Sequence, residues 1–309
     1  MVDRSGSRKP ISFLGVPLGY GASMAGVDMG PAALRVAGLN QRINSLGYRV
    51  RDLGDLRLER PQVIPQPQDK LKYVNEIRSA CEQLARSVEE IMNAGEFPIV
   101  LGGDHSIAIG SFSGISAYYR KRNETLGLVY FDAHADMNTP ETTPSGNIHG
   151  MPLAALLGYG VPELTNVHGF SPKVDPQHVV HIGARDIDPG ERELIHKLGI
   201  RFITMRDIDE RGMSACIDEA IHIASAANAG YSVTFDVDAL DPGDAPGSGT
   251  LVRGGLTYRE AHLAMEKIAE AGGMRSLEVV EINTALDVNN KTAELGVELI
   301  LSALGKTIL

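Results

Sequence analysis

Short apolar runs alternate with longer amphipathic stretches along most of this chain. Several of the short runs are continuous rather than alternating, which is typical of parallel strands that are covered on both faces. These runs predict strands at residues 11–16, 98–101, 126–131, 179–183, 200–204, 231–235 and 276–280.

Helical spacing occupies the stretches between these runs. Residues 70–94 carry a small or apolar face made of Val74, Ile77, Cys81, Leu84, Val88 and Ile91. Residues 257–271 open with Thr257 and Glu260 at capping-box spacing, and Asp188 before Pro189 marks another helix start. A last helix is expected at 291–305. The alternation predicts an α/β fold: a three-layer, doubly wound, mostly parallel sheet with helices on both faces.

The composition fits a globular protein, because 43% of the 309 residues are hydrophobic and 22% are charged. Internal repeats and low-complexity tracts are not apparent. The Pro/Gln-rich stretch 59–69 is expected to be a surface loop, since apolar patterning continues on both sides of it. We therefore expect a single domain over residues 1–309.

The charge balance argues against nucleic-acid and membrane partners. Lys and Arg total 29 and Asp and Glu total 39, which leaves a net charge of −10. Cys81 and Cys216 form no disulfide or zinc pattern, which fits a reducing compartment. Residues 1–10 are polar, and the chain shows no run of the roughly 18 apolar residues that would span a bilayer. The expected location is cytoplasmic.

Polar residues follow five of the predicted strands. In open α/β sheets, ligands bind outside the carboxyl ends of the strands. So many carboxylates at one edge would repel each other unless cations neutralised them. The residues concerned are Asp104 and His105, then Asp132, His134 and Asp136, then Arg185, Asp186 and Asp188, then Asp236 and Asp238, and finally Glu281.

The D-x-H-x-D spacing suits metal binding, because alternate residues of an extended chain face the same way. Oxygen and imidazole ligands without a thiolate favour Mn²⁺ or a related ion over structural Zn²⁺. The candidate ligands exceed the needs of one ion, and bridging carboxylates would hold two metals about 3.5–4 Å apart. A single Asp-x-Asp after a strand is more often a turn or a helix cap, but three groups at strand ends favour a metal site.

In these motifs the sequence resembles the arginase family of ureohydrolases. The resemblance implies an arginase-like fold and hydrolysis of L-arginine to L-ornithine and urea by a hydroxide that bridges two Mn²⁺ ions. It covers nearly the whole chain, in the blocks GVDMGPAALR (26–35), GGDHS (102–106), DAHADMNTPETTPSGNIHG (132–150), ARDIDPGE (184–191), FDVDALDP (235–242), GGLTYRE (254–260) and VEIN (280–283).

The resemblance also implies a ligand set for the two ions. One ion would be held by His105, Asp132, Asp136 and Asp236, and the other by His134, Asp132, Asp236 and Asp238. Asp132 and Asp236 would bridge them. Asp136 would also pass a proton to the leaving amine.

Three further residues match active-site positions of the family: His149 and Glu281 as catalytic residues, and Thr250 as a substrate-binding residue. His149 would act as an acid/base that shuttles protons, although a lone histidine in a loop more often has only a structural role. Glu281 would hold the planar guanidinium, with an ordinary strand-end carboxylate as the alternative. Thr250 would donate its hydroxyl to Glu281.

Loop 138–147 indicates which guanidine is hydrolysed. Asn138, Ser145 and Asn147 match positions that bind the α-carboxylate of arginine. Asp188 and Glu191 match those that bind its α-amino group, and both can also cap a helix. Agmatine has no α-carboxylate, so arginine is favoured. The alternatives are an agmatinase or guanidinobutyrase, or a catalytically silent regulator that binds metal or arginine.

The chain departs from the family pattern at a few positions. Leu251 and Thr284 stand where proline is usual, Ala239 stands where glycine is common, and segment 19–25 lacks the family's more polar turn. None of these changes removes a ligand, but they alter the loops beside Glu281 and Asp238. By analogy with the family we expect a homotrimer or homohexamer.

Overall fold

The protein is represented by a computed structural model that describes residues 8–59, 61 and 70–307. Its described strands form one eight-stranded sheet in the order β2-β1-β3-β8-β7-β4-β5-β6. Every neighbouring pair is parallel. The strands are β1 (Ile11–Gly15), β2 (Val50–Asp55), β3 (Phe97–Leu101), β4 (Gly127–Phe131), β5 (Val179–Ala184), β6 (Arg201–Thr204), β7 (Tyr231–Asp236) and β8 (Met274–Val280).

All seven predicted strands are present, and β2 is an eighth strand that the sequence analysis did not predict. β2 lies at the edge of the sheet, and its sequence VRDLGD is partly or fully exposed along its length. An edge strand needs only one hydrogen-bonded neighbour and can carry polar side chains. Hydrophobic patterning therefore could not identify it.

The helices confirm the predicted starts. Asp188 caps α7 and Thr257 caps α10, each in a capping box with a glutamate three residues on. The described helices are α1 (Gly30–Val36), α2 (Leu39–Ser45), α3 (Val74–Asn93), α4 (Ala108–Arg120), α5 (Pro152–Leu156), α6 (Pro162–Thr165), α7 (Pro189–Leu198), α8 (Met205–Arg211), α9 (Met213–Ala224), α10 (Tyr258–Ala271) and α11 (Lys291–Ala303).

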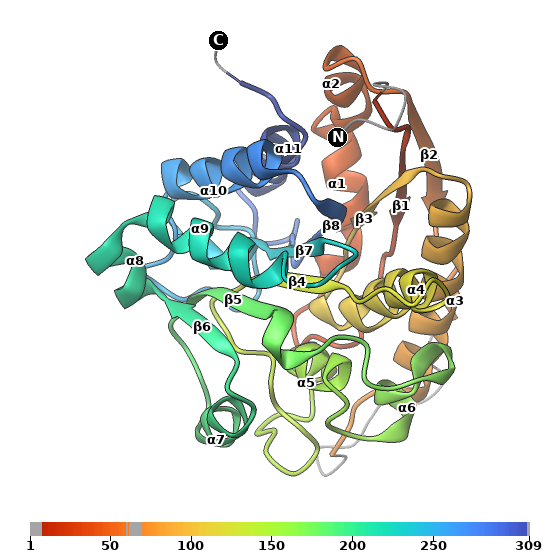
Figure 1. Cartoon of the computed structure of the whole chain (residues 1–309), viewed down its shortest axis with the longest axis vertical. Helices are drawn as coiled ribbons and strands as arrows, with labels where there is room; N and C mark the ends of the chain where they lie inside the picture. Colours follow the sequence, from red (N-terminus) through yellow and green to blue (C-terminus); the bar gives the residue numbers. More distant parts are fainter. Residues whose placement is uncertain (1–7, 60, 62–69, 308–309) are drawn as a thin grey trace.

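The sheet lies between two hydrophobic layers, as predicted. Alternate residues of a strand point to opposite faces, so Ile99 and Leu101 of β3 join one buried cluster and Val100 joins the other. The first cluster includes α1, α2, α9, α10 and α11, and the second includes α3 and α4. Figure 1 shows α9, α10 and α11 grouped apart from α3 and α4.

Two glycines allow α4 to pack closely on α3. A Cβ at Gly110 would come 2.8 Å from the Cys81 carbonyl oxygen, and a Cβ at Gly114 would come 2.3 Å from that of Ala85. Real side chains do not tolerate such approaches. The two helices therefore pack as one layer on a face of the sheet.

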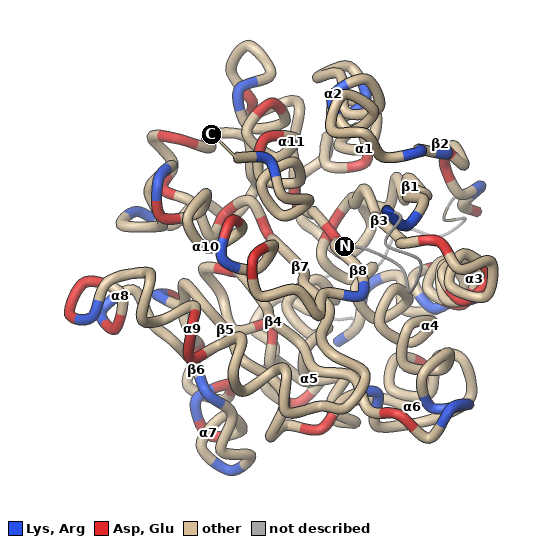
Figure 2. The backbone as a smooth tube through the Cα atoms, turned by 45° about the horizontal axis from the view of Figure 1, so that its top comes forward, with Lys and Arg blue, Asp and Glu red and all other residues tan. Residues whose placement is uncertain are grey.

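The surface carries charges of both signs, and both cysteines lie inside the protein. Cys81 and Cys216 are buried free thiols. Figure 2 shows acidic and basic residues interspersed along the outer helices α3, α8 and α10. Among the described residues, none of the helices combines the length and apolar character needed to cross a membrane. The loop expected at 59–69 lies outside the described residues except for positions 59 and 61.

Candidate metal centre

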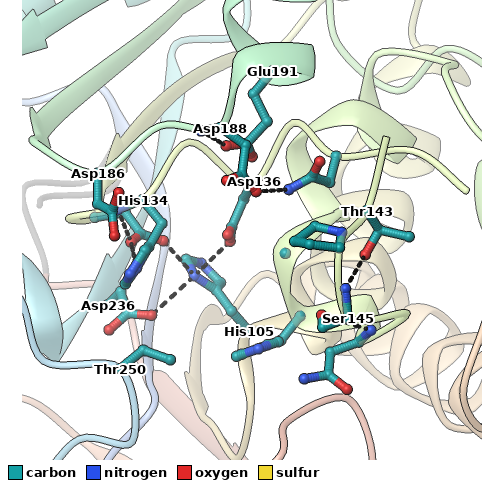
Figure 3. Close-up of a pocket in the computed structure, with 16 residues that line it drawn as sticks. His105, His134, Asp136, Thr143, Ser145, Asp186, Asp188, Glu191, Asp236 and Thr250 are labelled. Carbon is teal, nitrogen blue, oxygen red and sulfur yellow. Dashed lines mark hydrogen bonds and ion pairs between the residues drawn. The ribbon is translucent and has the colours of Figure 1, made fainter. Parts of the chain in front are cut away.

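The order of the strands brings the predicted site residues to one edge of the sheet. The strands β3, β8, β7, β4 and β5 are successive neighbours, and each of them is followed by candidate residues. His105 opens a short 3-10 helix (His105–Ile107) after β3, and Asp236 is the last residue of β7. Figure 3 shows the resulting cluster of side chains.

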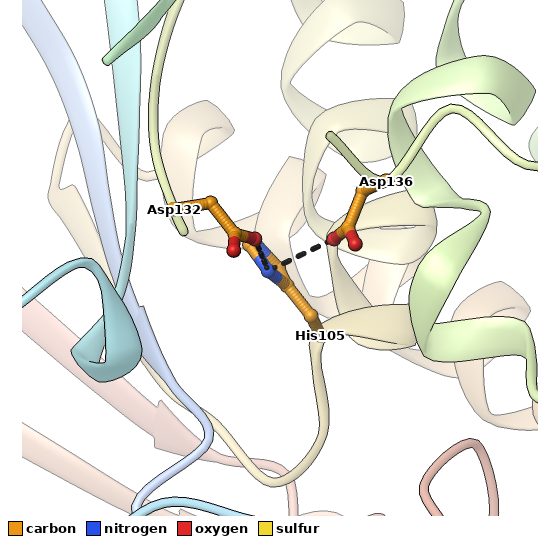
Figure 4. Close-up of side chains that lie close together, drawn as sticks. All are labelled: His105, Asp132 and Asp136. Carbon is orange, nitrogen blue, oxygen red and sulfur yellow. Dashed lines mark hydrogen bonds and ion pairs between the residues drawn. The ribbon is translucent and has the colours of Figure 1, made fainter. Parts of the chain in front are cut away.

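His105 gathers three carboxylates around one ring nitrogen. Its Nδ1 lies 3.0 Å from Asp132 Oδ2, 3.2 Å from Asp136 Oδ2 and 3.2 Å from Asp236 Oδ2. All four side chains are buried. His105, Asp132 and Asp136 present one ligand atom each at distances from one another that suit a shared metal ion (Figure 4).

A second group adjoins the first through Asp132. His134 Nδ1 lies 3.3 Å from Asp132 Oδ1 and 3.2 Å from Asp238 Oδ2. The two oxygens of Asp132 thus face different imidazoles, which is the arrangement that a bridging carboxylate requires. Asp236 faces the first group through Oδ2, while its Oδ1 accepts the N–H of Asp238 at 2.8 Å. Its role as a second bridge stays a prediction.

The backbone around the cluster is held in unusual conformations. Asp136 and Glu281 have φ values of 53° and 63°, in the left-handed region that residues other than glycine rarely adopt. Such positions persist where the surrounding structure fixes them, and they concentrate at functional sites. The Tyr130 hydroxyl donates to Asp136 Oδ2 at 2.6 Å, and the N–H of Glu281 donates to the Gly103 carbonyl at 2.8 Å.

The buried carboxylates of the cluster repel one another, which a positive charge among them would offset. Burial and neighbouring carboxylates raise the pKa of Asp136 and Asp236 well above the usual range. Burial alone would lower the pKa of His105, but the surrounding carboxylates outweigh burial and raise it. Hydrogen bonds and charge from His105 and His134 hold the pKa of Asp132 well below its usual range despite its burial. Divalent cations among these ligands would satisfy the excess negative charge.

An open cavity of about 640 Å³, part of it continuous with solvent, lies over the cluster. Its floor includes every proposed ligand except the fully buried Asp238: His105, Asp132, His134, Asp136 and Asp236. Its walls come mainly from loop 138–150 and the start of α7. The wall residues are Asn138, Thr143, Pro144, Ser145, Asn147, His149, Gly150, Asp186, Asp188, Glu191 and Thr250.

The residues expected to bind a carboxylate lie together on one wall. Ser145 Oγ accepts the N–H of Asn147 at 3.2 Å, which leaves its hydroxyl hydrogen available to a ligand. Asn147 Oδ1 accepts a hydrogen bond from Lys72 Nζ at 2.9 Å. Asn138 Nδ2 donates to Asp188 Oδ2 at 2.9 Å. The wall therefore offers neutral donors beside one lysine.

Asp188 and Glu191 both cap α7 and line the cavity, so a capping role and a place in the cavity coexist, as the sequence analysis allowed. Glu191 accepts the N–H of Asp188 at 2.8 Å and that of Met137 at 2.9 Å. Burial raises the pKa of Glu191 to about 7 in spite of these hydrogen bonds. Binding of an amino group by this pair stays a prediction.

His149 and Glu281 form a pair beside the cavity. Glu281 Oε1 lies 3.0 Å from His149 Nδ1 and accepts the N–H of His105 at 2.8 Å. Burial lowers the pKa of His149, but Glu281 outweighs it and raises this pKa to about 9. A carboxylate at this place is suited to a cationic partner.

One predicted contact is wrong. Thr250 donates its hydroxyl to Asp238 Oδ2 at 2.8 Å rather than to Glu281. The reason is the neighbouring guanidinium of Arg185, which donates to the carbonyls of Asp238 and Val252 and so ties the Thr250 loop to the end of β7. Thr250 therefore orients a candidate metal ligand.

Two polar residues of the cavity had no role assigned from the sequence. Thr143 and Asp186 line the cavity. Thr143 and Asp186 lie inside the sequence blocks that resemble the arginase family, and Asp186 also follows a predicted strand. Their positions along the chain were therefore the available signal that they belong to the site. Spacing alone could not show that their side chains face the same space.

The sequence is similar to those of known proteins over nearly its whole length. A profile of the Arginase family matches residues 9–305. The chain is 48% identical over 302 residues to the arginase of Bacillus caldovelox, with 97% of this chain and 100% of that protein covered. It is 47% identical over 301 residues to the arginase of Bacillus subtilis strain 168, with 97% and 99% covered.

Solved structures show the same fold. The native structure of arginase from Bacillus caldovelox at pH 5.6 has a TM-score of 0.93 at 46% identity, covering 98% of this chain and 100% of that one. A hypothetical agmatinase from Burkholderia thailandensis has a TM-score of 0.74 at 22% identity, covering 97% and 86%. The latter likeness concerns the fold alone.

Proposed function

The chain belongs to the arginase family of hydrolases, and from that premise we propose that this centre hydrolyses L-arginine to L-ornithine and urea. The bond broken is a guanidino carbon–nitrogen bond. The observation that carries the proposal is the pair of imidazole–carboxylate groups that share Asp132 beneath a cavity lined by polar residues.

We propose two Mn²⁺ ions as cofactors. The buried cluster fits them, since it offers oxygen and imidazole ligands in two adjoining groups and carries excess negative charge. When bound, such ions lower the pKa of water to about 7 and so supply a nucleophile near neutral pH. The proposed holders are His105, Asp132, Asp136 and Asp236 for one ion and His134, Asp132, Asp236 and Asp238 for the other.

The chain's own residues bind the substrate and move protons. Glu281 would hold the guanidinium, because a carboxylate accepts paired hydrogen bonds from that planar cation. His149 lies 3.0 Å from Glu281 at the edge of the cavity, where it can exchange protons with solvent. Asp136, oriented by the Tyr130 hydroxyl, would pass a proton to the amine that leaves.

The cavity wall would select an α-amino acid. Asn138, Ser145 and Asn147 would bind the α-carboxylate, and Asp188 and Glu191 would bind the α-amino group. These two sets line one cavity and are joined by the hydrogen bond from Asn138 to Asp188. A substrate without an α-carboxylate would leave the first set without its partner.

We propose that residues 1–309 act as one catalytic domain, and that copies assemble as a homotrimer or homohexamer, as the family resemblance implies. The two free buried cysteines support a cytoplasmic location.

Urea release from Mn²⁺-loaded protein tests the function. We expect arginine to be hydrolysed with a much higher kcat/KM than agmatine or guanidinobutyrate. A preference for either of the latter would indicate another guanidine hydrolase. Arginine binding in a calorimeter without urea release would indicate a catalytically silent relative.

A further inference from the structure

Glu278 is a buried carboxylate to which the proposed chemistry gives no role. It lies on β8, is 2% exposed and carries two hydrogen bonds from hydroxyl groups. The Thr234 hydroxyl donates to Oε1 at 2.9 Å, and the Ser111 hydroxyl donates to Oε2. Burial of a carboxylate costs free energy unless the carboxylate is hydrogen-bonded or paired, and these two hydroxyl groups supply that hydrogen bonding.

Thr234 connects Glu278 to the metal centre. The two residues are partners in the register of β7 and β8, so their side chains project on the same face of the sheet. Thr234 Oγ1 also lies 3.0 Å from His105 Nε2. Both Thr234 and His105 are buried. Water therefore does not substitute easily for any member of the chain Glu278–Thr234–His105.

The direction of these hydrogen bonds decides the tautomer of His105. A hydroxyl has one hydrogen, and Thr234 directs it to Glu278. Its oxygen then accepts from His105, which places a proton on Nε2. The other ring nitrogen, Nδ1, is the one that faces Asp132, Asp136 and Asp236 and must be unprotonated to bind a metal.

We propose that Glu278 is a positioning residue that, through Thr234, keeps the Nδ1 atom of His105 free to bind the ion of the first group. The inference rests on the proposed function only in taking His105 as a ligand. Without Glu278, the Thr234 hydroxyl can turn and donate to Nε2. That geometry favours the tautomer with its proton on Nδ1, where the metal has to bind.

Four variants of the full-length protein test this role. Thr234→Val removes the connecting hydroxyl at almost constant volume, and Thr234→Ser restores it. Glu278→Met removes the acceptor. Ser111→Ala is the matched control, because it removes the other hydrogen bond to Glu278 without touching Thr234, and the Ser111 hydroxyl also reaches the Ile107 carbonyl.

Mn²⁺ is titrated into each metal-free protein, and the two binding steps are resolved by calorimetry and by electron paramagnetic resonance of the free ion. We expect Thr234→Val and Glu278→Met to weaken one step by about 10- to 100-fold, with Thr234→Ser and Ser111→Ala within about threefold of wild type. The step that involves His134 is expected to stay unchanged.

Equal affinities in wild type, Thr234→Val and Glu278→Met would overturn the proposal. So would an equal weakening of both steps, because a general loss of structure would produce it. If Glu278→Met does not fold, the Thr234→Val and Thr234→Ser pair decides the question. A wild-type protein that binds two Mn²⁺ ions but releases no urea contradicts the proposed function instead, and leaves this comparison valid.

Discussion

Removal of the Ser145 hydroxyl tests which substrate the cavity selects. Ser145 Oγ already accepts the N–H of Asn147, so its own hydrogen is the part left for a ligand. Ser145→Ala would remove one hydrogen bond to the charged α-carboxylate, worth about 1.5–3 kcal/mol. Since 1.4 kcal/mol is a factor of ten, kcat/KM for arginine should fall by about 10- to 150-fold.

The loop itself should survive the change. Ser145 is exposed, so water can replace its oxygen as the acceptor for the Asn147 N–H. Asn147 also remains tied to Lys72 through its side chain. The loss in Ser145→Ala should therefore reflect the missing contact with the substrate.

Steady-state urea release is measured with arginine and with agmatine, which lacks the α-carboxylate. Agmatine turnover should be nearly the same in wild type and Ser145→Ala. Thr139→Ala is the matched control, because Thr139 lies in the same loop and its hydroxyl donates to Glu141 rather than facing the cavity. An equal loss for both substrates, or no loss for arginine, would refute the assigned role.

Four further predictions address the metal centre, the proton carrier and the packing. Asp238→Asn should lower Mn²⁺ content by weakening the His134 group, and full occupancy by metal analysis would count against that group. His149→Asn should reduce kcat by about 10²–10⁴-fold with both ions retained, and unchanged turnover would exclude a role in proton transfer. In metal-free protein the pKa of His149 is raised to about 9, so the contribution of the His149–Glu281 pair to folding stability is fully present below pH 6.5 and is lost as pH rises through 9. Unfolding in urea should therefore show wild type more stable than His149→Asn at about pH 6. A difference in the free energy of unfolding that persists at about pH 10 would be evidence against the pair. Gly114→Ala would place a Cβ 2.3 Å from the Ala85 carbonyl and should destabilise the fold by about 1–3 kcal/mol, which a thermal melt would show as a lower Tm.

The layered sheet was predictable because its strands are short stretches rich in apolar residues, some continuous and some alternating. β4 (GLVYF) is a continuous apolar run and β7 (YSVTFD) alternates apolar with polar residues, and both strands are buried along their whole length. β2 was missed because its exposed polar residues are tolerated at an edge. Helix starts at Asp188 and Thr257 were predictable because a capping box is a local interaction that its own few residues determine.

The candidate site was predictable only in part, because strand ends can be located in a sequence but side-chain partners cannot. The position of His105 and Asp236 at one edge follows from parallel strand order. The hydrogen bond from Thr250 to Asp238 could not be predicted in this way, because it depends on Arg185, which joins the loop of Val252 to the residues that follow β7. Glu278 was likewise hidden, because a buried glutamate within a strand has no local pattern that reveals its contacts.

The central claim is that the carboxylates and imidazoles at the carboxyl ends of three strands, β3, β4 and β7, hold two metal ions. The most direct measurement is anomalous diffraction at the manganese absorption edge from crystals of Mn²⁺-loaded full-length protein. Two peaks are predicted, one beside His105 and one beside His134, with Asp132 between them. A single peak, or peaks away from these side chains, would contradict the claim.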